Sequence, residues 1–186
     1  MSTASASGGG AAVDERTARR VAEAARESEW RLPSFGKQLF MGRLRMDLIH
    51  PHPRPAPEDV ERGEAFLRRL REFLAENVDP QRIEREARIP DDVVAGLREI
   101  GALGMKIDEK YGGLGLNQLY YGRALMLAGS ISPAIGALLS AHQSIGVPQP
   151  IKMFGTEEQK ARWLPRCVNE ISAFLLTEPT SMSARP

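Results

Sequence analysis

The sequence predicts a mainly α-helical bundle in which one β-strand begins close to the C-terminus. Apolar residues recur at helical spacing over residues 57–78, and residues 117–146 are apolar on almost every helical face. A short apolar run of β-compatible composition occurs only at residues 171–176. We therefore expect four successive segments: a disordered tail (1–13), an N-terminal extension with a proline-rich linker (14–56), a helical domain (57–170) and the start of a β domain (171–186).

The first two segments carry few signals of a packed core. Residues 1–13 are rich in glycine, serine and alanine and lack a basic region followed by a hydrophobic core, so they do not predict a secretory signal. Residues 14–30 have the charges and alanines of a helix with a weak apolar stripe. The next stretch, up to Ile49, carries apolar side chains that predict packing against another surface. Prolines from Pro51 to Pro57 then predict a stiff, extended linker.

The clearest helix spans residues 57–78. Pro57 suits a first helical turn, and Glu58 and Asp59 favour the positive end of the helix dipole. The apolar positions expected to face inward are Val60, Ala65, Phe66, Leu67, Leu70, Phe73 and Leu74. Arginines interleaved with glutamates favour a solvated outer face, with a phosphate-binding patch as the alternative.

A break at residues 77–80 separates this helix from a second one that begins near Pro90. Gly101 and Gly104 are candidate C-terminal caps of the second helix. The glycine-dense loop EKYGGLG, residues 109–115, follows them without a preceding strand. It therefore predicts a turn and not a dinucleotide-binding or P-loop fingerprint.

Residues 117–146 are expected to form two helices divided at residues 130–133, because proline favours the first turn of a helix. Helices this apolar belong at the centre of a bundle or in an oligomer contact. His142 lies in this stretch and is expected to be a hydrogen-bonded core residue. No Cys, Asp or Glu lies near it at the spacing of metal ligands, and His50 and His52 likewise lack further ligands.

The last helical signal is a capping box at TEEQ. The hydroxyl of Thr156 and the amide of Gln159 satisfy two backbone N–H groups of a helix start. A short helix is expected from here to Trp163, and Pro165 is expected to open a further helix.

The composition is that of a globular protein of 186 residues, 42% of them hydrophobic and 26% charged. Lys and Arg total 25 against 24 Asp and Glu, which argues against nucleic-acid binding through bulk charge. No stretch approaches the ~20 apolar residues that span a membrane. The single cysteine, Cys167, favours a reducing, cytoplasmic location. A small core filler is the favoured interpretation of this residue, and a catalytic thiol is the alternative.

Three segments occur in the order and spacing found in one enzyme family: YGGLG at 111–115, FGTEEQKARWLP at 154–165 and AFLLTEP at 173–179. Together with the helical run between them, they resemble the acyl-CoA dehydrogenase family over about residues 57–179. The resemblance implies that family's N-terminal helical bundle followed by the first strand of its β domain. The upstream stretch ESEWRLPSFGKQLF looks like extensions carried by some longer bacterial members.

The resemblance implies a flavin-dependent oxidation of an acyl-CoA. In the family a glutamate removes a proton next to the thioester while hydride leaves the neighbouring carbon for FAD, which gives a 2-enoyl-CoA. Carried over by motif, Leu176 and Thr177 would contact the flavin, and Ser183 stands at the place of the motif's serine. Outside the family, Thr177 would be an ordinary strand-end hydroxyl. An electron acceptor and a homo-oligomer are also implied.

The match to the family motif then fails. Met182 and Ala184 stand where the motif has glycine and aspartate, and methionine cannot replace the conformational freedom of glycine. The family's catalytic base belongs to a later domain, so Glu178 is not assigned this role and no catalytic or metal-binding residue is predicted. We expect a chain truncated just after Pro179 and inactive alone. The alternative is a non-catalytic helical binding or assembly module.

Overall fold

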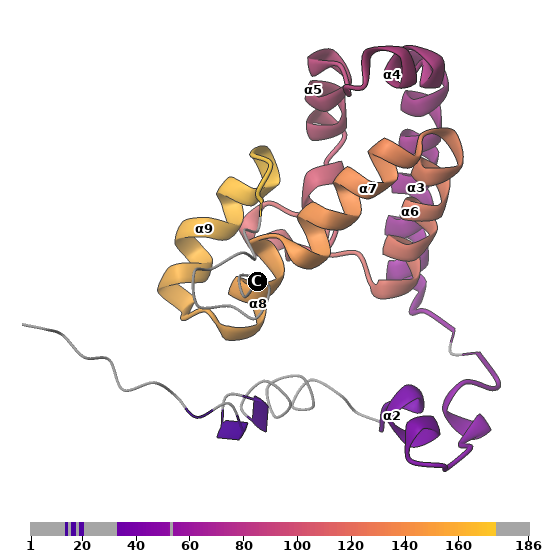
Figure 1. Ribbon diagram of the computed structural model, residues 1–186, viewed down its shortest axis with the longest axis vertical. Coiled ribbons are helices and arrows are strands. Elements are labelled where there is room, and N and C mark those ends of the chain that lie inside the picture. Colours follow the sequence, from indigo (N-terminus) through magenta and orange to yellow (C-terminus); the bar gives the residue numbers. More distant parts are fainter. Residues whose placement is uncertain (1–13, 15, 18, 21–32, 53, 174–186) are drawn as a thin grey trace, which may run out of the picture. The chain divides into compact units, whose positions relative to one another are not determined.

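A computed structural model of the chain describes residues 14, 16–17, 19–20, 33–52 and 54–173. The chain divides into two compact units, residues 1–53 and residues 54–186. Helices and the turns between them make up the described residues, which contain no β-strand. The predicted mainly α-helical class is therefore confirmed (Figure 1).

The described part of the first unit includes α2 (Phe35–Phe40) and the 3₁₀ turn η1 (Met46–Leu48). Ser34 caps α2, because its hydroxyl accepts the backbone N–H of Lys37 at 3.3 Å. Large apolar side chains that are at least 41% exposed are Leu39, Phe40, Met41, Leu44, Met46 and Ile49. The described residues of this unit do not bury these side chains, so the packing predicted for this stretch stays a prediction. The helix predicted over residues 14–30 lies mostly outside the described residues.

Helices make up most of the second unit. Their bounds are α3 (Pro57–Asn77), α4 (Pro80–Glu86), α5 (Asp91–Glu99), η2 (Ala102–Gly104), η3 (Glu109–Tyr111), α6 (Gln118–Ile131), α7 (Pro133–Ser140), the π-helical turn η4 (Ala141–Ile145), α8 (Pro148–Phe154) and α9 (Glu157–Asn169). Within the described ranges, no helix combines the length and apolar character needed to cross a membrane.

One face of α3 lies at the centre of the core. Its start follows the sequence signals, with Pro57 in the first turn and Glu58 and Asp59 beside it. The buried residues of this helix are Gly63, Phe66, Leu67, Leu70 and Leu74. Most of the predicted inward positions are therefore confirmed, whereas Val60 remains 37% exposed.

The apolar run after Asn117 forms two helices, as predicted, and α6 packs against both α3 and α7 (Figure 1). The side chain of Asn117 caps α6 by accepting the backbone N–H of Tyr120 at 3.1 Å. Pro133 occupies the first turn of α7. The ring of Tyr120 lies against Gly63, where a Cβ atom would overlap it. The close approach of α3 and α6 therefore depends on a residue without a side chain.

Helix α4 is not among the predicted elements. Asp79 caps it, because its carboxylate accepts the backbone N–H groups of Gln81 at 2.9 Å and Arg82 at 3.1 Å. Pro80 occupies the first turn, and Ile83 is the buried residue of the helix. A helix of 7 residues with one buried side chain leaves no apolar period to detect. The sequence therefore predicts only a break at this position.

The prediction of separate helices on either side of Pro165 is wrong, because α9 runs through this residue without a break. Pro165 has no N–H to donate to the carbonyl one turn earlier, and such a loss usually ends or kinks a helix. Here Leu164 and Cys167 are both buried and form one apolar cluster with Ile107. This packing on both sides of the proline holds the two halves in one helix.

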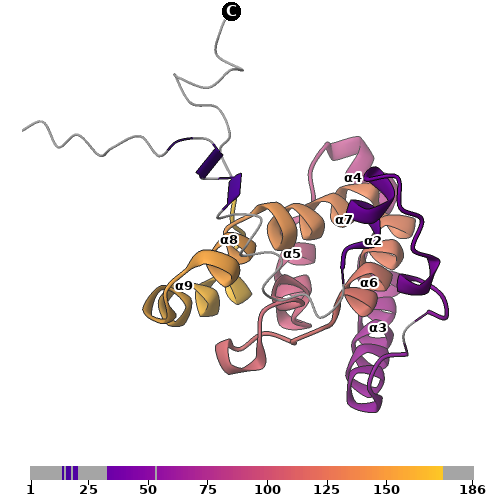
Figure 2. The ribbon, with the colours of Figure 1, turned by 90° about the horizontal axis from the view of Figure 1, so that it is seen from below.

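Helix α7 leads from the α3–α6 pair to η4, which contacts α8, and α8 packs in turn against α9. In both views α8 and α9 lie at the other end of this unit from α3 and α6 (Figure 2). A large apolar cluster fills the space around α3, α5, α6 and α7, and a smaller one lies beneath α9. The turn η4 lies between the two ends, and it is π-helical where the sequence predicts the last part of a helix.

Candidate functional site

The predicted flavin-contact residues Leu176, Thr177 and Ser183 lie outside the described residues. The strand predicted over residues 171–176 is absent from its described part, residues 171–173, and the remainder also lies outside. The described residues end at residue 173, shortly before the predicted flavin contacts in the sequence. We call this place the exit junction and define it by four residues: His142, Gln143, Cys167 and Ser172.

His142 lies at the centre of the exit junction and is 1% exposed. Its Nδ1 accepts the backbone N–H of Ser172 at 3.0 Å. Its Nε2 lies 3.1 Å from the carbonyl oxygen of Leu103 and 2.9 Å from that of Cys167. Burial lowers the pKa of His142, because the charged imidazolium loses its hydration there. The predicted hydrogen-bonded core histidine is therefore confirmed.

Gln143 extends the same junction toward the segment that follows η2. Its side-chain oxygen accepts the backbone N–H of Lys106 at 3.1 Å, and its amide nitrogen donates to the carbonyl of Leu103. Gln143 is 1% exposed. Among the described residues, no buried side-chain nitrogen or oxygen lacks a hydrogen-bond partner. Both groups of the Gln143 amide are thus satisfied by backbone groups of residues 103 and 106.

A largely apolar cavity of about 330 Å³ opens beside the exit junction. Its lining comes from α8, α9 and the residues after α9: Val147, Ile151, Trp163, Arg166, Cys167, Glu170, Ile171 and Ser172. Arg166 and Glu170 form an ion pair of 3.0 Å at its edge. The cavity therefore offers an apolar surface next to the point where the chain leaves α9.

Cys167 is buried, with 6% of its surface exposed. Burial raises the pKa of the Cys167 thiol, so the reactive thiolate form is disfavoured. The thiol packs with Ile107 and Leu164 in the smaller apolar cluster. These observations favour the core filler over the catalytic thiol.

The YGGLG loop is a turn, as predicted, and it pairs with the segment that follows η2. The backbone N–H of Leu114 donates to Gly104 at 2.9 Å, and that of Leu116 donates to Met105 at 2.8 Å. A Cβ atom on Gly113 would overlap the carbonyl oxygen of Ile107. The loop therefore needs glycine for this close approach, and it hydrogen-bonds to the stretch that contains Leu103 and Lys106, the backbone partners of Gln143.

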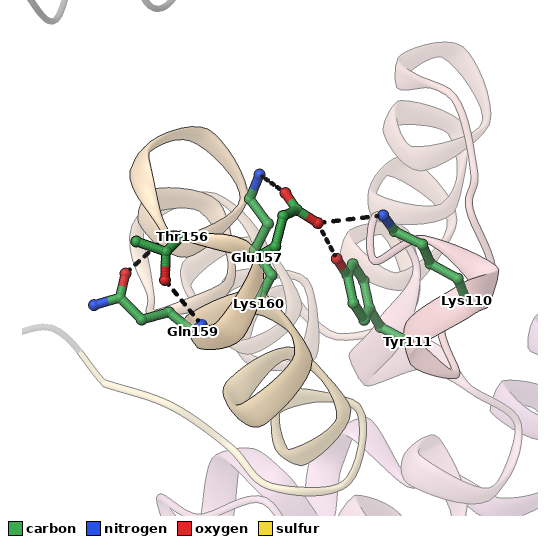
Figure 3. A network of polar contacts seen from close by, with 6 residues as sticks. All are labelled: Lys110, Tyr111, Thr156, Glu157, Gln159 and Lys160. Carbon is green, nitrogen blue, oxygen red and sulfur yellow. Dashed lines mark hydrogen bonds and ion pairs between the residues drawn. The ribbon is translucent and has the colours of Figure 1, made fainter.

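A polar network joins this loop to the start of α9 (Figure 3). The capping box is present, because the Thr156 hydroxyl accepts the N–H of Gln159 at 3.2 Å. The Glu157 carboxylate accepts hydrogen bonds from the Tyr111 hydroxyl at 3.2 Å and from Lys160 at 2.9 Å. These partners, Lys160 first, lower the pKa of Glu157. The Glu157 carboxylate therefore links the loop to the start of α9.

Metal chemistry finds no support in the described part of the chain. No group of three or more His, Cys, Asp or Glu side chains there could hold a metal ion. Both ring nitrogens of His142 are already engaged by backbone groups.

Sequence analysis missed two residues of the exit junction, Gln143 and Ser172. One signal was available for Gln143, because it adjoins His142 within an otherwise apolar run and two adjacent buried polar residues require partners. Ser172 gave no signal, since its partner lies 30 positions earlier in the chain.

Comparisons with known proteins agree with this architecture. The family model "Acyl-CoA dehydrogenase, N-terminal domain" matches residues 61–170. The probable acyl-CoA dehydrogenase FadE10 of Mycobacterium tuberculosis is 56% identical over 168 residues, which cover 90% of this chain and 26% of that protein. The very long-chain specific acyl-CoA dehydrogenase, mitochondrial, of Homo sapiens is 35% identical over 156 residues, covering 81% of this chain and 23% of that protein.

Two solved structures share the fold. The first is described as the electron transferring flavoprotein of Acidaminococcus fermentans, with a TM-score of 0.57 and 34% identity over 65% of this chain and 33% of that chain. The second, the prolyl acyl carrier protein oxidase AnaB, has a TM-score of 0.50 over 62% of this chain and 30% of that chain, and at 23% identity it shows the fold alone.

The chain spans about a quarter of the length of the curated relatives it matches. The matched region, residues 61–170, includes α3 to α9 almost entirely. It amounts to more than half of the 186 residues. This chain therefore belongs to the acyl-CoA dehydrogenase family, whose N-terminal domain it contains.

Proposed function

We propose that this chain supplies the helical domain of a FAD-dependent acyl-CoA dehydrogenase, which oxidises the α,β C–C bond of an acyl-CoA to give a 2-enoyl-CoA. The observation that carries the proposal is the match of the family's N-terminal domain to residues 61–170. The 56% identity with a probable acyl-CoA dehydrogenase over 90% of the chain supports it. In this proposal residues 57–170 are the helical domain and residues 171–186 begin the β domain.

The residues proposed to contact the flavin follow the exit junction directly. FAD, when bound, would accept the hydride that leaves the acyl chain. Backbone groups of Leu176 and Thr177 and the Thr177 hydroxyl would hold the flavin ring in position, and Ser183 would add a hydroxyl contact. The general base would come from a later domain of the complete enzyme, outside residues 1–186.

The proposal includes an electron acceptor that reoxidises the flavin and assembly into a homo-oligomer. The exposed apolar side chains of α6 that support an assembly contact are Met126, at 76% exposed, and Ile131, at 36%. A cytoplasmic location is proposed from the single cysteine of the sequence, which suits a reducing compartment.

Residues 1–186 alone are proposed to be inactive, because the family's base is not among them. The test is to mix the purified chain with FAD, saturated acyl-CoA thioesters and an artificial electron-accepting dye. We expect no thioester-dependent reduction of the dye. Measurable reduction by the pure chain would contradict this part of the proposal.

A second candidate function is a binding or assembly module that no longer supports catalysis. The departure of Met182 and Ala184 from the family motif favours it. A chimera separates the two functions: residues 1–186 replace the matching region of the M. tuberculosis relative, and the purified protein is examined for bound flavin. A folded, yellow chimera with stoichiometric FAD supports the enzyme domain, and a folded, colourless one supports the module.

A further inference from the structure

Ser172 is the residue at which the structure shows the chain being held just before the proposed flavin contacts. It precedes Leu176 by four positions in the sequence. Its backbone N–H donates to Nδ1 of His142 at 3.0 Å. Its hydroxyl oxygen lies 2.9 Å from the same nitrogen and accepts the backbone N–H of Val147 at 3.2 Å. Both polar groups of Ser172 are thus engaged by η4 and the start of α8.

The partners of His142 determine which ring nitrogen carries the proton. A backbone N–H can only donate, so Nδ1, which receives the N–H of Ser172, must be the unprotonated nitrogen. Backbone carbonyls can only accept, so Nε2, which faces those of Leu103 and Cys167, must carry the proton. The arrangement therefore requires a neutral imidazole in a single tautomer. One side chain ties together η2, the end of α9 and the exit residue.

We propose that His142 is a positioning residue, which anchors Ser172 and thereby fixes where the segment carrying Leu176 and Thr177 begins. The flavin-related part of this inference rests on the proposed function, whereas the anchoring of Ser172 does not. Because only three residues lie between Ser172 and Leu176, a shift of Ser172 leaves little chain in which to absorb it. His142 thus acts on the flavin contacts through the backbone.

Two other roles for His142 do not fit the geometry. A nucleophilic Ser172 activated by His142 would need a ring nitrogen free to take the hydroxyl proton, and Nδ1 already accepts the backbone N–H of Ser172. A metal ligand would need a free lone pair on the ring, and the only lone pair is on Nδ1, which already accepts from Ser172.

Two substitutions separate the functions of the two ring nitrogens. In His142→Asn the amide oxygen falls near the position of Nδ1 and can still accept from Ser172. In His142→Gln the amide nitrogen falls near the position of Nε2, so the carbonyl partners are kept and the anchor is lost. Tyr121→Phe is the matched control, because it removes the 2.6 Å hydrogen bond to Ser144 without touching Ser172.

The first measurement is hydrogen exchange of the Ser172 amide in the 1–186 chain, relative to the amide of Leu70 in the core of α3. We expect exchange at Ser172 to rise roughly ten-fold in His142→Gln, as for the loss of a hydrogen bond. It should stay within about two-fold of wild type in His142→Asn and in Tyr121→Phe. Equal exchange in all variants would overturn the anchor.

A second measurement remains decisive if a variant fails to fold. The ¹⁵N spectrum of the wild-type imidazole should show an unprotonated Nδ1 and a protonated Nε2, and the opposite tautomer would overturn the anchor. Gly146→Ala perturbs both partners of the anchor, because its Cβ would lie 2.6 Å from the Ser172 hydroxyl oxygen and 2.6 Å from the backbone carbonyl oxygen of His142. We expect it also to accelerate exchange at Ser172.

The flavin-related part is tested in the chimera with the M. tuberculosis relative. We expect His142→Gln to weaken FAD binding at least five-fold relative to the Tyr121→Phe chimera, about the effect of one lost hydrogen bond. Unchanged FAD binding would overturn the positioning role. If the anchor is found in the 1–186 chain but no chimera binds FAD, the proposed function fails and the anchoring of Ser172 stands.

Discussion

Single residues determine where the described fold is least tolerant of change, and His142 is the clearest example. It is neutral, buried and bonded through both ring nitrogens, so a second proton on the ring would meet the N–H of Ser172. Its pKa is lowered by burial, which means that the unfolded chain binds this proton more readily than the folded one. His142 therefore lowers the free energy of unfolding only under acidic conditions, where the unfolded chain binds the proton.

This linkage predicts a pH dependence of the free energy of unfolding. The free energy of unfolding should have its full value at a pH above about 6.5, the pKa of histidine in the unfolded chain. It should fall as the pH drops below that value toward the lower pKa of the folded state, by at most about 1.4 kcal/mol per pH unit. Urea unfolding at pH 7.5 and pH 5.5 measures the effect. His142→Asn should flatten the dependence, and an unchanged slope in that variant would contradict this account of His142.

Gly63 is a second residue that tolerates little change, because the packing around it leaves no room for a side chain. A methyl group at this position would overlap the ring of Tyr120, so Gly63→Ala should lower the free energy of unfolding by about 1–3 kcal/mol. Gly122→Ala on α6 is the matched control, because nothing lies within 4 Å of its added Cβ. There alanine should be neutral or stabilising, by up to about 1 kcal/mol. Equal effects of the two substitutions would contradict the close contact between α3 and α6.

Among the elements, α9 shows how packing overrides a local signal. Leu164 and Cys167 are buried on both sides of Pro165, and their contacts keep the helix continuous although one backbone carbonyl loses its usual donor. The proline therefore weakens a helix that the apolar cluster beneath it stabilises.

Pro165→Ala should accordingly raise the free energy of unfolding by about 1 kcal/mol, because it restores the missing N–H. Pro133→Ala is the comparison, since Pro133 occupies the first turn of α7, where the N–H has no partner within the helix. That substitution should be neutral or slightly destabilising. Urea unfolding of both variants gives the difference, and a less stable Pro165→Ala protein would show that the proline is needed in α9.

The elements that the sequence predicts correctly are those whose signals are local. The apolar period of α3, the proline that separates α6 from α7 and the capping box of α9 can all be recognised within one or two turns of chain. Helix α4 is too short to show a period, and the continuity of α9 depends on the distant residue Ile107. The turn η4 likewise depends on contacts with η2 and α8, which sequence periodicity does not report.

At the scale of the whole molecule, sequence and structure contribute different parts of the site. The motif AFLLTEP nominates Leu176 and Thr177, which lie outside the described residues and remain predictions. The structure contributes the exit junction, whose contact between His142 and Ser172 joins residues 30 positions apart. No local pattern could have revealed that contact.

The account's central claim is that these helices serve acyl-CoA oxidation, and thioester-dependent turnover tests it most directly. The chimera that carries residues 1–186 in the M. tuberculosis relative is assayed beside the unmodified relative, with a saturated acyl-CoA and an electron-accepting dye. We predict 2-enoyl-CoA formation with kcat/KM within about ten-fold of the relative, a loss of no more than about 1.4 kcal/mol of transition-state stabilisation. A folded chimera that binds FAD yet forms no 2-enoyl-CoA, beside an active relative, would contradict the claim.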